Sequence, residues 1–568
     1  MSFSKRQFLI PSFLLFFLNL AVKANANCEV SLLRDRAKPE DITAAKEVFE
    51  SSTHALNPDS LPDKFKAPSV QIQNGYIVGG EIKVWKGPMD DVYSPIRVES
   101  AVGVVTRQYL GQVPRMDAQT GLAVYENSRQ AWNHGQGEWP KKTLKERIAH
   151  MQKFLDGMLL KRQELINLIM WEINKNEKLA TTEVDRTIAY AKDTIAEAIK
   201  LENELSQIQS IGSDSFKLGR EPLGVVPIFA PYNYPLNETF TNLIPALLMG
   251  NIVLVKPARY GVLLMNPLLE LFRDSFPPGV VNFIYGDGRE VFSKINEVGG
   301  YEGLGYIGGE RGALSILQTN GAAHRTKATL GLGAKNMAVI LNDANMELAI
   351  SANLEGCLTY SGQRCTAHKI LFVQRGIAEV FLNKFSVAVD NLKVGTAFDK
   401  DVTITASPDN TWLDTQSRMT SDALSKGARI ANLSGGLSMN GIFSPTILVG
   451  VTPEMEIYNK EQFGSVIPVV IFDEISEVLA WQRQSPYGQQ AAVFGQDEST
   501  LKIFVDGLRR QVGRININGA CRRSPDGIPF GARANSGLGT LSLRDALLAF
   551  TTDSVICENR TASQAVVK

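Results

Sequence analysis

A chain of 568 residues with 59 basic and 59 acidic side chains has no formal net charge. This balance gives no support to nucleic-acid binding or to electrostatic docking on an anionic membrane. Hydrophobic residues make up 44% of the chain and are interspersed along it, as in globular proteins, and the length predicts several domains around more than one core.

The first 26 residues differ from the rest of the chain. Lys5-Arg6 precedes an apolar run from Phe8 to Val22, and the small-x-small triplet Ala24-Asn25-Ala26 follows. A basic start, a short apolar run and a small-residue site are typical of a secretory signal peptide, and this run is short for a membrane span. We therefore expect residues 1–26 to be cleaved, leaving an exported periplasmic or extracellular protein with no membrane contact.

The cysteines and histidines form no metal or disulfide pattern. Five cysteines are scattered along the chain, which is not the arrangement of a disulfide scaffold. The five histidines do not pair at the spacing of metal ligands. We expect no metal site.

Up to residue 222 the chain changes from strand signals to helix signals. Residues 27–85 form an N-terminal extension of mixed polarity, and residues 86–105 carry strand and turn signals. Residues 116–205 repeat apolar side chains at helical spacing. The polar segment 205–222 predicts a projecting arm.

From residue 223 apolar runs of the buried-strand type alternate with helical segments. Such an alternation, with glycine-rich turns after the strands, predicts a parallel sheet in an α/β domain. A second series of the same kind occupies residues 331–530, and a short apolar tail follows over 531–568. The Gly286-Asp-Gly288 turn lacks the third glycine of a dinucleotide fingerprint and is weak evidence alone.

Seven short motifs fall in an order that resembles the aldehyde dehydrogenase superfamily. The similarity extends from about residue 90 to 560, and it is closest to the branch of NADP-dependent, non-phosphorylating glyceraldehyde-3-phosphate dehydrogenases. The motifs are Ala230-Pro-Tyr-Asn-Tyr-Pro235, Val255-Lys-Pro257, Tyr306-Ile-Gly-Gly-Glu-Arg-Gly312, Tyr360-Ser-Gly-Gln-Arg-Cys-Thr-Ala367, Glu461-Gln-Phe-Gly464, Tyr487-Gly488 and Pro529-Phe530.

The resemblance implies an α/β fold in three parts. A Rossmann-type dinucleotide-binding domain would span 86–330, an α/β catalytic domain 331–530, and a small β arm would combine 205–222 with the tail. Because the arm is too polar to fold alone, we expect it to pair across a subunit interface in a homodimer or homotetramer.

The resemblance assigns the chemistry to Cys365. Its thiolate would attack an aldehyde carbon, and the Asn233 amide with the Cys365 backbone N–H would stabilise the oxyanion. Without the other motifs a lone cysteine is more often a small buried hydrophobe, which remains the interpretation of Cys357. His368, three residues further on, is interpreted as structural.

The same resemblance implies a nicotinamide cofactor and a phosphorylated aldehyde. Arg259 stands where NAD-preferring members often carry Glu, so NADP is favoured, although NAD is possible. The cofactor-binding candidates are Lys256, Arg259, Gly308, Gly309, Glu461 and Phe463. The substrate-binding candidates, which would hold glyceraldehyde 3-phosphate or a similar small molecule, are Arg186, Tyr234, Arg364 and Arg523.

One departure from the family pattern concerns turnover. The family carries a glutamate 34 positions before the cysteine, where it activates water to hydrolyse the thioester; this chain has Gly331 there. General-base help is typically worth about 10²–10⁴-fold, so hydrolysis should be slow. Ala334, Ser465 and the segment Thr405-Ala406-Ser407 also depart from the pattern.

Three interpretations follow from this mixture. The first is a dehydrogenase with another base or another acyl acceptor, such as a thiol. The second is a deacylation-deficient or inactive homologue that binds nucleotide or sugar phosphate or serves as a structural oligomer. The third is an acyl transferase without hydride transfer. The retained Cys365, Asn233 and arginines favour the first.

Overall fold

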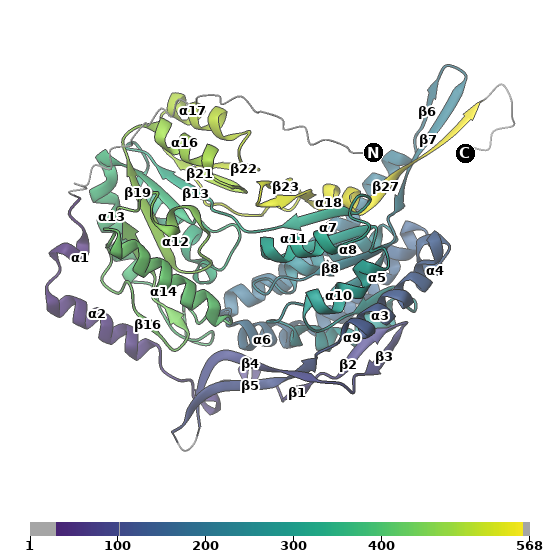
Figure 1. The fold of residues 1–568 in the computed structure, drawn as a ribbon, viewed down its shortest axis with the longest axis horizontal. Helices are drawn as coiled ribbons and strands as arrows, with labels where there is room; N and C mark the ends of the chain where they lie inside the picture. The colour runs from purple at the N-terminus through teal and green to yellow at the C-terminus, as the bar shows by residue number, and fades with distance from the viewer. Residues whose placement is uncertain (1–29, 101–102, 560–568) are drawn as a thin grey trace, which may run out of the picture. The chain divides into compact units, whose positions relative to one another are not determined.

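The structure is a computed structural model that describes residues 30–100 and 103–559. The predicted signal peptide lies outside the described residues. From Ser31 onward the described chain forms one unit that contains two large sheets, each covered by helices, and this confirms the α/β class (Figure 1). Within the described chain no helix is both long and apolar enough to span a membrane.

The N-terminal extension is part of the folded body. The backbone N–H of Arg34 donates to the Ala431 carbonyl (3.1 Å), and its guanidinium donates to the Gly435 carbonyl (2.9 Å), so the extension contacts a segment 401 positions further along the chain. Its elements are α1 (Leu33–Arg36), α2 (Pro39–Ser52), β1 (Gln71–Ile72), β2 (Gly75–Val78), β3 (Glu81–Val84), β4 (Met89–Glu99) and β5 (Val105–Pro114).

The helical stretch that follows consists of several helices with clear boundaries. Thr143 caps α5 in a reciprocal pair with Glu146, which satisfies backbone N–H groups that a helix start leaves free. Asn174 adopts a left-handed φ of 57° and ends α6, and Asn176 caps α7. The helices are α3 (Ala118–Trp132), α4 (Glu138–Lys141), α5 (Leu144–Leu160), α6 (Arg162–Ile173) and α7 (Glu177–Leu205).

The first large sheet has the strand order β10-β9-β8-β11-β12-β25, parallel except for β25. Chain order reverses between β8 and β11, and ligands bind at such switch points beyond the carboxyl ends of the strands. The elements are β8 (Val225–Phe229), α8 (Asn237–Leu248), β9 (Ile252–Lys256), α9 (Asn266–Ser275), β10 (Val281–Phe283), α10 (Gly288–Glu297), β11 (Gly303–Ile307), α11 (Glu310–Thr319), β12 (Lys327–Gly331) and β25 (Gly537–Leu538).

The second large sheet has the order β15-β18-β19-β14-β13-β21-β22, with its own apolar core that includes Phe372, Trp481 and Phe504. The catalytic cysteine predicted from the sequence follows α12 and precedes β14. The elements are β13 (Met337–Ile340), α12 (Met346–Leu358), β14 (Ile370–Gln374), α13 (Arg375–Asp390), α14 (Asn410–Ser425), β15 (Arg429–Ile430), β18 (Thr446–Val449), α15 (Glu456–Asn459), β19 (Val466–Phe472), α16 (Ile475–Gln484), β21 (Gln490–Phe494), α17 (Glu498–Leu508) and β22 (Arg514–Ile517).

A third, smaller sheet projects from the body in Figure 1. It joins β6 (Ile208–Ile211), β7 (Asp214–Pro222) and the C-terminal β27 (Thr551–Asn559) in the antiparallel order β27-β7-β6, with α18 (Leu543–Ala549) just before β27. Segments 205–222 and the tail, which are far apart in the sequence, therefore form one structure.

Candidate active site

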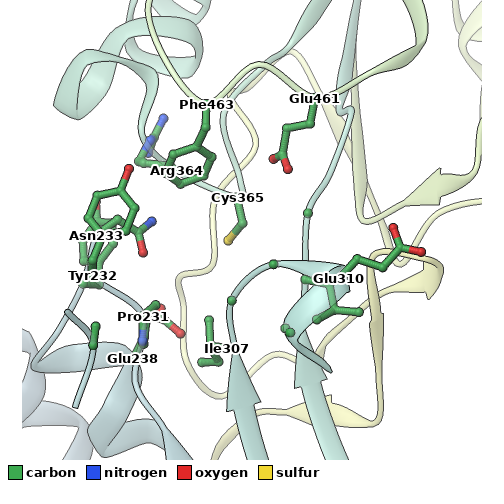
Figure 2. Close-up of a pocket in the computed structure, with 18 of the residues that line it drawn as sticks. Pro231, Tyr232, Asn233, Glu238, Ile307, Glu310, Arg364, Cys365, Glu461 and Phe463 are labelled. Atoms are coloured by element: carbon green, nitrogen blue, oxygen red, sulfur yellow. The ribbon is translucent and has the colours of Figure 1, made fainter. Parts of the chain in front are cut away.

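A cavity of about 1330 Å³ brings together all the residues predicted for catalysis, substrate and cofactor. Figure 2 shows Cys365, Asn233, Glu461 and Phe463 around it. The predicted residues among its lining are Arg186, Asn233, Tyr234, Lys256, Arg259, Gly308, Gly309, Gly331, Arg364, Cys365, Glu461, Phe463 and Arg523. They come from the ends of several strands and from loops of both sheets, so the fold itself assembles the site.

The loop before Cys365 has an unusual backbone. Tyr360, Ser361 and Gly362 have consecutive left-handed φ angles of 52°, 51° and 76°. Left-handed backbone is unfavourable for residues with a Cβ, so a run of this kind needs support from its surroundings. At Gly362 a Cβ would collide with the Gly464 carbonyl oxygen, so only glycine fits there.

Hydrogen bonds from distant segments supply that support. The Ser361 hydroxyl donates to the Thr405 carbonyl (3.1 Å) and accepts from the Thr405 N–H (2.9 Å). The Ser407 hydroxyl donates to the Gln363 side-chain carbonyl (2.9 Å). Two positions that depart from the family pattern thus hold the cysteine loop, a role that sequence reasoning did not predict.

Asn336 holds the cysteine itself. Its side-chain amide donates to the carbonyls of Cys365 (2.7 Å) and Ala367 (3.0 Å), while its oxygen accepts from the Gln490 N–H (3.0 Å). Sequence reasoning missed this residue, although it directly follows the Leu330–Lys335 stretch. It ties the nucleophile to two neighbouring strands, β13 and β21.

The surroundings of Cys365 keep the thiol protonated at rest. Burial raises its pKa, and the negative charge of Glu238 adds to the effect. A hydrogen bond with Gln489 and the ammonium of Lys369 act in the opposite direction without reversing it. The thiolate is therefore a minor form until something in the cavity favours it.

Asn233 lies on the turn after β8, and its amide donates to the Gln363 carbonyl (2.9 Å). An amide nitrogen carries two N–H groups, so one remains for a ligand. Among the described residues no acceptor contacts the backbone N–H of Cys365. Two donors of the kind an oxyanion requires are thus present at the cavity.

A buried ion pair, Lys175 with Glu183, holds the backbone that follows Asn233. The Glu183 carboxylate accepts from the backbone N–H groups of Leu236 (3.0 Å) and Asn237 (3.3 Å) at the start of α8. Lys175 pairs with Glu183 (2.5 Å), and its ammonium lies 3.3 Å from the centre of the Tyr234 ring. Burial lowers the pKa of Lys175 to about 8, although Glu183 opposes the shift.

Gly331 ends β12 and lines the cavity, so the position of the missing carboxylate faces the site. Its φ is outside the left-handed region, and an added Cβ would meet the Ile307 side chain at 3.3 Å. Glu461 pairs with Lys369 and accepts from the Ala334 N–H (3.1 Å), which fixes its carboxylate against the segment after Gly331.

The far end of the cavity is suited to a nucleotide. Lys256 ends β9, and burial lowers its pKa to about 8, with Asp287 opposing. Arg259 is exposed, and its guanidinium carbon lies 5.8 Å from the centre of the Tyr260 ring; in the described ranges no carboxylate pairs with it. Gly309 begins α11 without a side-chain cap, whereas the Asp287 carboxylate caps α10 through Arg289 (3.0 Å) and Glu290 (3.3 Å). An anion fits the N-terminus of α11, and that of α10 is already satisfied.

The predicted phosphate-binding arginines have partners within the chain. Arg186 pairs with Asp526 (2.6 Å), and the buried Arg523 pairs with Glu238. Arg364 donates to the backbone carbonyls of Glu355 (2.9 Å) and Gly356 (3.2 Å). Glu238, on the first turn of α8, was not singled out from the sequence because nothing there indicates that it meets a residue 285 positions away.

Outside the cavity, His368 contacts Asn353 (2.8 Å) with one ring nitrogen and accepts from the Cys521 N–H (3.0 Å) with the other. Burial lowers its pKa to about 3, so the ring is neutral. Cys357 is buried, and burial raises its pKa beyond that of a reactive thiol. Neither residue lines the cavity.

A comparison with known proteins decides the family. The model of the aldehyde dehydrogenase family matches residues 96–556. This chain belongs to the aldehyde dehydrogenase family. The family and its named relatives support an oxidoreductase, and they confirm the resemblance drawn from the seven motifs.

The relatives of this aldehyde dehydrogenase carry two kinds of name. An NADP-dependent glyceraldehyde-3-phosphate dehydrogenase of Streptococcus equinus is 31% identical over 84% of this chain and 96% of its own length. A lactaldehyde dehydrogenase of Escherichia coli (strain K12) is 27% identical over 83% and 95%. A solved structure is similar as well: the NADP-dependent glyceraldehyde-3-phosphate dehydrogenase from Bacillus halodurans C-125, complexed with NADP. Its sequence is 29% identical to this chain, and the two structures superpose with a TM-score of 0.78 over 86% of this chain and 100% of that one.

Proposed function

We propose that this protein is an NADP-dependent aldehyde dehydrogenase that forms a thioester on Cys365 faster than it hydrolyses it. The single observation behind the proposal is that Cys365, Asn233 and the residues suited to a nucleotide, Lys256, Arg259 and Gly309, line one cavity. The glyceraldehyde-3-phosphate and lactaldehyde dehydrogenases among the relatives supply the first substrates to test.

The residues fit NADP on grounds of charge. The exposed guanidinium of Arg259 contacts the Tyr260 ring and has no carboxylate partner in the described part of the chain, so it is available to a 2′-phosphate; Lys256 ends β9, three residues earlier. The uncapped start of α11 would hold the pyrophosphate, and Phe463 with Glu461 would hold the nicotinamide end. When bound, NADP supplies the hydride acceptor for the oxidation.

The chain's own residues carry the first step, the addition of the Cys365 sulfur to the aldehyde. The Cys365 sulfur, once deprotonated, forms a bond to the aldehyde carbon, and the carbonyl electrons move to the oxygen. The free N–H of Asn233 and the backbone N–H of Cys365 donate to that oxygen and stabilise its charge. Asn336 holds the backbone of Cys365 during the attack.

Hydrolysis of the thioester is the weak step. Water must attack the acyl carbon, lose a proton to a base and release the Cys365 thiol. Because Gly331 has no side chain, the base of the family is absent. The same observation favours the second candidate, a homologue that binds nucleotide and acylates once but does not turn over.

Export and assembly belong to the proposal as well. We place the mature protein outside the cytoplasm, with Asn27 as its first residue; N-terminal sequencing that finds Met1 would contradict this. We also propose a homodimer or homotetramer held by the small sheet, because β6 is an edge strand and the side chains of Ile211, Val555 and Ile556 are more than half exposed. A concentration-independent monomer in sedimentation would contradict it.

The test of the activity is NADPH formation by the reduced, full-length mature protein. Glyceraldehyde 3-phosphate, glyceraldehyde and lactaldehyde are each supplied with NADP, with and without a small thiol that can accept the acyl group. Absorbance at the NADPH band that depends on Cys365 supports the proposal. Nucleotide binding without any NADPH from any aldehyde moves the assignment to the second candidate.

A further inference from the structure

Four charged side chains near the substrate end of the cavity neutralise one another. This paired cluster consists of Arg186, Glu238, Arg523 and Asp526. Arg523 pairs with Glu238 and has its Nε 3.6 Å from Asp526, and Asp526 also pairs with Arg186 (2.6 Å). The two guanidinium groups and two carboxylates sum to zero, so neither arginine offers an uncompensated charge to a phosphate dianion.

The paired cluster is largely shielded from water, so the interactions between its charges are only weakly screened. Arg523 is 6% exposed, and the side chains of Glu238 and Asp526 are about 16% and 15% exposed. Charges screened this little by water interact strongly, so the carboxylate of Glu238 offsets the attraction of Arg523 for an anion placed beside the pair. Arg364 lies outside this paired cluster: one of its terminal nitrogens donates to the carbonyls of Glu355 and Gly356, and its guanidinium keeps its positive charge.

One buried donor in the cluster has no partner. The second terminal nitrogen of Arg523, Nη2, makes no hydrogen bond within the described part of the chain, while Nη1 contacts Glu238. An unpaired buried donor is costly, and such groups in a cavity indicate the place of a ligand. A hydroxyl group suits this place because it accepts from Arg523 and donates to the Glu238 carboxylate. A phosphate dianion only accepts.

Glu238 also lies on the path of the substrate. It follows Asn233 by five residues, lines the cavity and belongs to the same wall as Asn233 in Figure 2. Cys365 lines the same cavity, and the negative charge of Glu238 contributes to the raised pKa of its thiol. A substrate held by Cys365 and Asn233 therefore shares this cavity with the Glu238 carboxylate.

We infer that Glu238 makes this site select a short, unphosphorylated hydroxyaldehyde over its phosphorylated counterpart. The inference rests on the proposed dehydrogenase function and names its substrate class. The hydroxyl groups of the substrate replace the phosphate as the group that the cluster recognises. Arg186 and Arg523 then orient Glu238 and Asp526 and donate to the hydroxyls.

The test compares glyceraldehyde with glyceraldehyde 3-phosphate by kcat/KM for NADPH formation. The variant is Glu238→Gln, which removes the charge and keeps the size. The matched control is Glu355→Gln, the same change at an exposed side chain lining the same cavity. The unmodified protein should prefer glyceraldehyde at least about 10-fold. Glu238→Gln should shift the ratio toward the phosphorylated substrate by about 10-fold or more, and Glu355→Gln by less than about 3-fold.

A preference of the unmodified protein for glyceraldehyde 3-phosphate would overturn the inference, and so would a ratio that Glu238→Gln leaves unchanged. If Glu238→Gln does not fold, Asp526→Asn should shift the ratio in the same direction by releasing Arg186.

A binding measurement distinguishes a wrong inference about Glu238 from a wrong assignment of the dehydrogenase function. Inorganic phosphate is titrated calorimetrically into each protein, which needs no turnover. It should bind Glu238→Gln and not the unmodified protein. Phosphate binding to the unmodified protein, or to neither, would overturn the inference. Absence of NADPH with both aldehydes, together with the expected phosphate result, would instead contradict the proposed function alone.

Discussion

The loop that carries Cys365 and the end of strand β12 face the same cavity, yet they differ in how completely they are equipped. The cysteine loop is fixed by hydrogen bonds from Thr405, Ser407 and Asn336, and oxyanion donors lie beside it. The end of β12 presents Gly331 and no titratable group. Under the proposed function, the residues for attack on an aldehyde are in place, whereas the end of β12 holds no base for hydrolysis.

This contrast divides the reaction into two halves with separate requirements. Formation of the thioester needs a held nucleophile and positioned donors. Hydrolysis needs a base aimed at water. Changes on the cysteine side should therefore affect the first half, and changes at position 331 should affect only the second.

Removing the nucleophile should have the largest effect. Cys365→Ser should lower NADPH formation by about 10⁴-fold or more, because an unactivated hydroxyl does not replace the thiol. Cys357→Ser serves as the control, since Cys357 is buried away from the cavity, and it should retain activity within about 3-fold. Equal activity losses in both variants would mean that Cys365 is not the nucleophile.

Restoring a base should come next. Gly331→Glu should raise the steady-state rate by about 10²-fold. The backbone permits it, because φ at Gly331 is not left-handed and the new Cβ needs only a small movement of Ile307. Gly331→Gln, which has the same shape without a basic carboxylate, should give no gain. A similar gain in both variants would show that shape, not proton transfer, limits the rate.

A change at Arg259 should have a smaller effect, on the preference for NADP over NAD. Arg259→Glu should weaken NADP binding by about 10–100-fold relative to NAD, since a carboxylate repels the 2′-phosphate that the guanidinium would hold. The dissociation constants of both nucleotides can be followed by protein fluorescence. Arg289→Glu, a change of the same kind at another exposed residue of the cavity, is the control. Equal affinity for both nucleotides in the unmodified protein would exclude this role of Arg259.

The smallest effect concerns the acidity of the thiol. Since the pKa of Cys365 is raised, its alkylation by iodoacetamide should still accelerate above pH ~8.5, the ordinary thiol value. Glu238→Gln removes a charge that raises the pKa of the thiol, so the alkylation profile should move toward lower pH. A profile that levels off below pH ~8 in the unmodified protein would contradict the environment described for this cysteine.

Much of the site could be predicted from the sequence because its residues lie beside recognisable strands. Asn233, Lys256, Gly308 and Gly331 lie at or just after the carboxyl ends of β8, β9, β11 and β12, and parallel strands bring those ends together. The local apolar pattern marks each strand, and the motifs mark its end.

The remaining features depend on partners that no local pattern reveals. The pairing of Arg523 with Glu238 joins residues 285 positions apart, and Arg34 in the N-terminal extension reaches Gly435 across 401 positions. Neither the side-chain charges nor the helical period of α8 specifies such a contact. It arises only when both sheets are in place, and the neutral charge of the paired cluster depends on it.

A rapid-mixing experiment separates the formation of the Cys365 thioester from its hydrolysis. The reduced protein is mixed with NADP and glyceraldehyde, and NADPH is followed by absorbance through the first turnover and beyond. If thioester formation is fast and hydrolysis slow, a fast burst of at most one NADPH per active site should appear. A slow phase should follow, which Gly331→Glu accelerates and Gly331→Gln does not. A linear trace with rapid turnover from the start would contradict it, because another base would then serve hydrolysis.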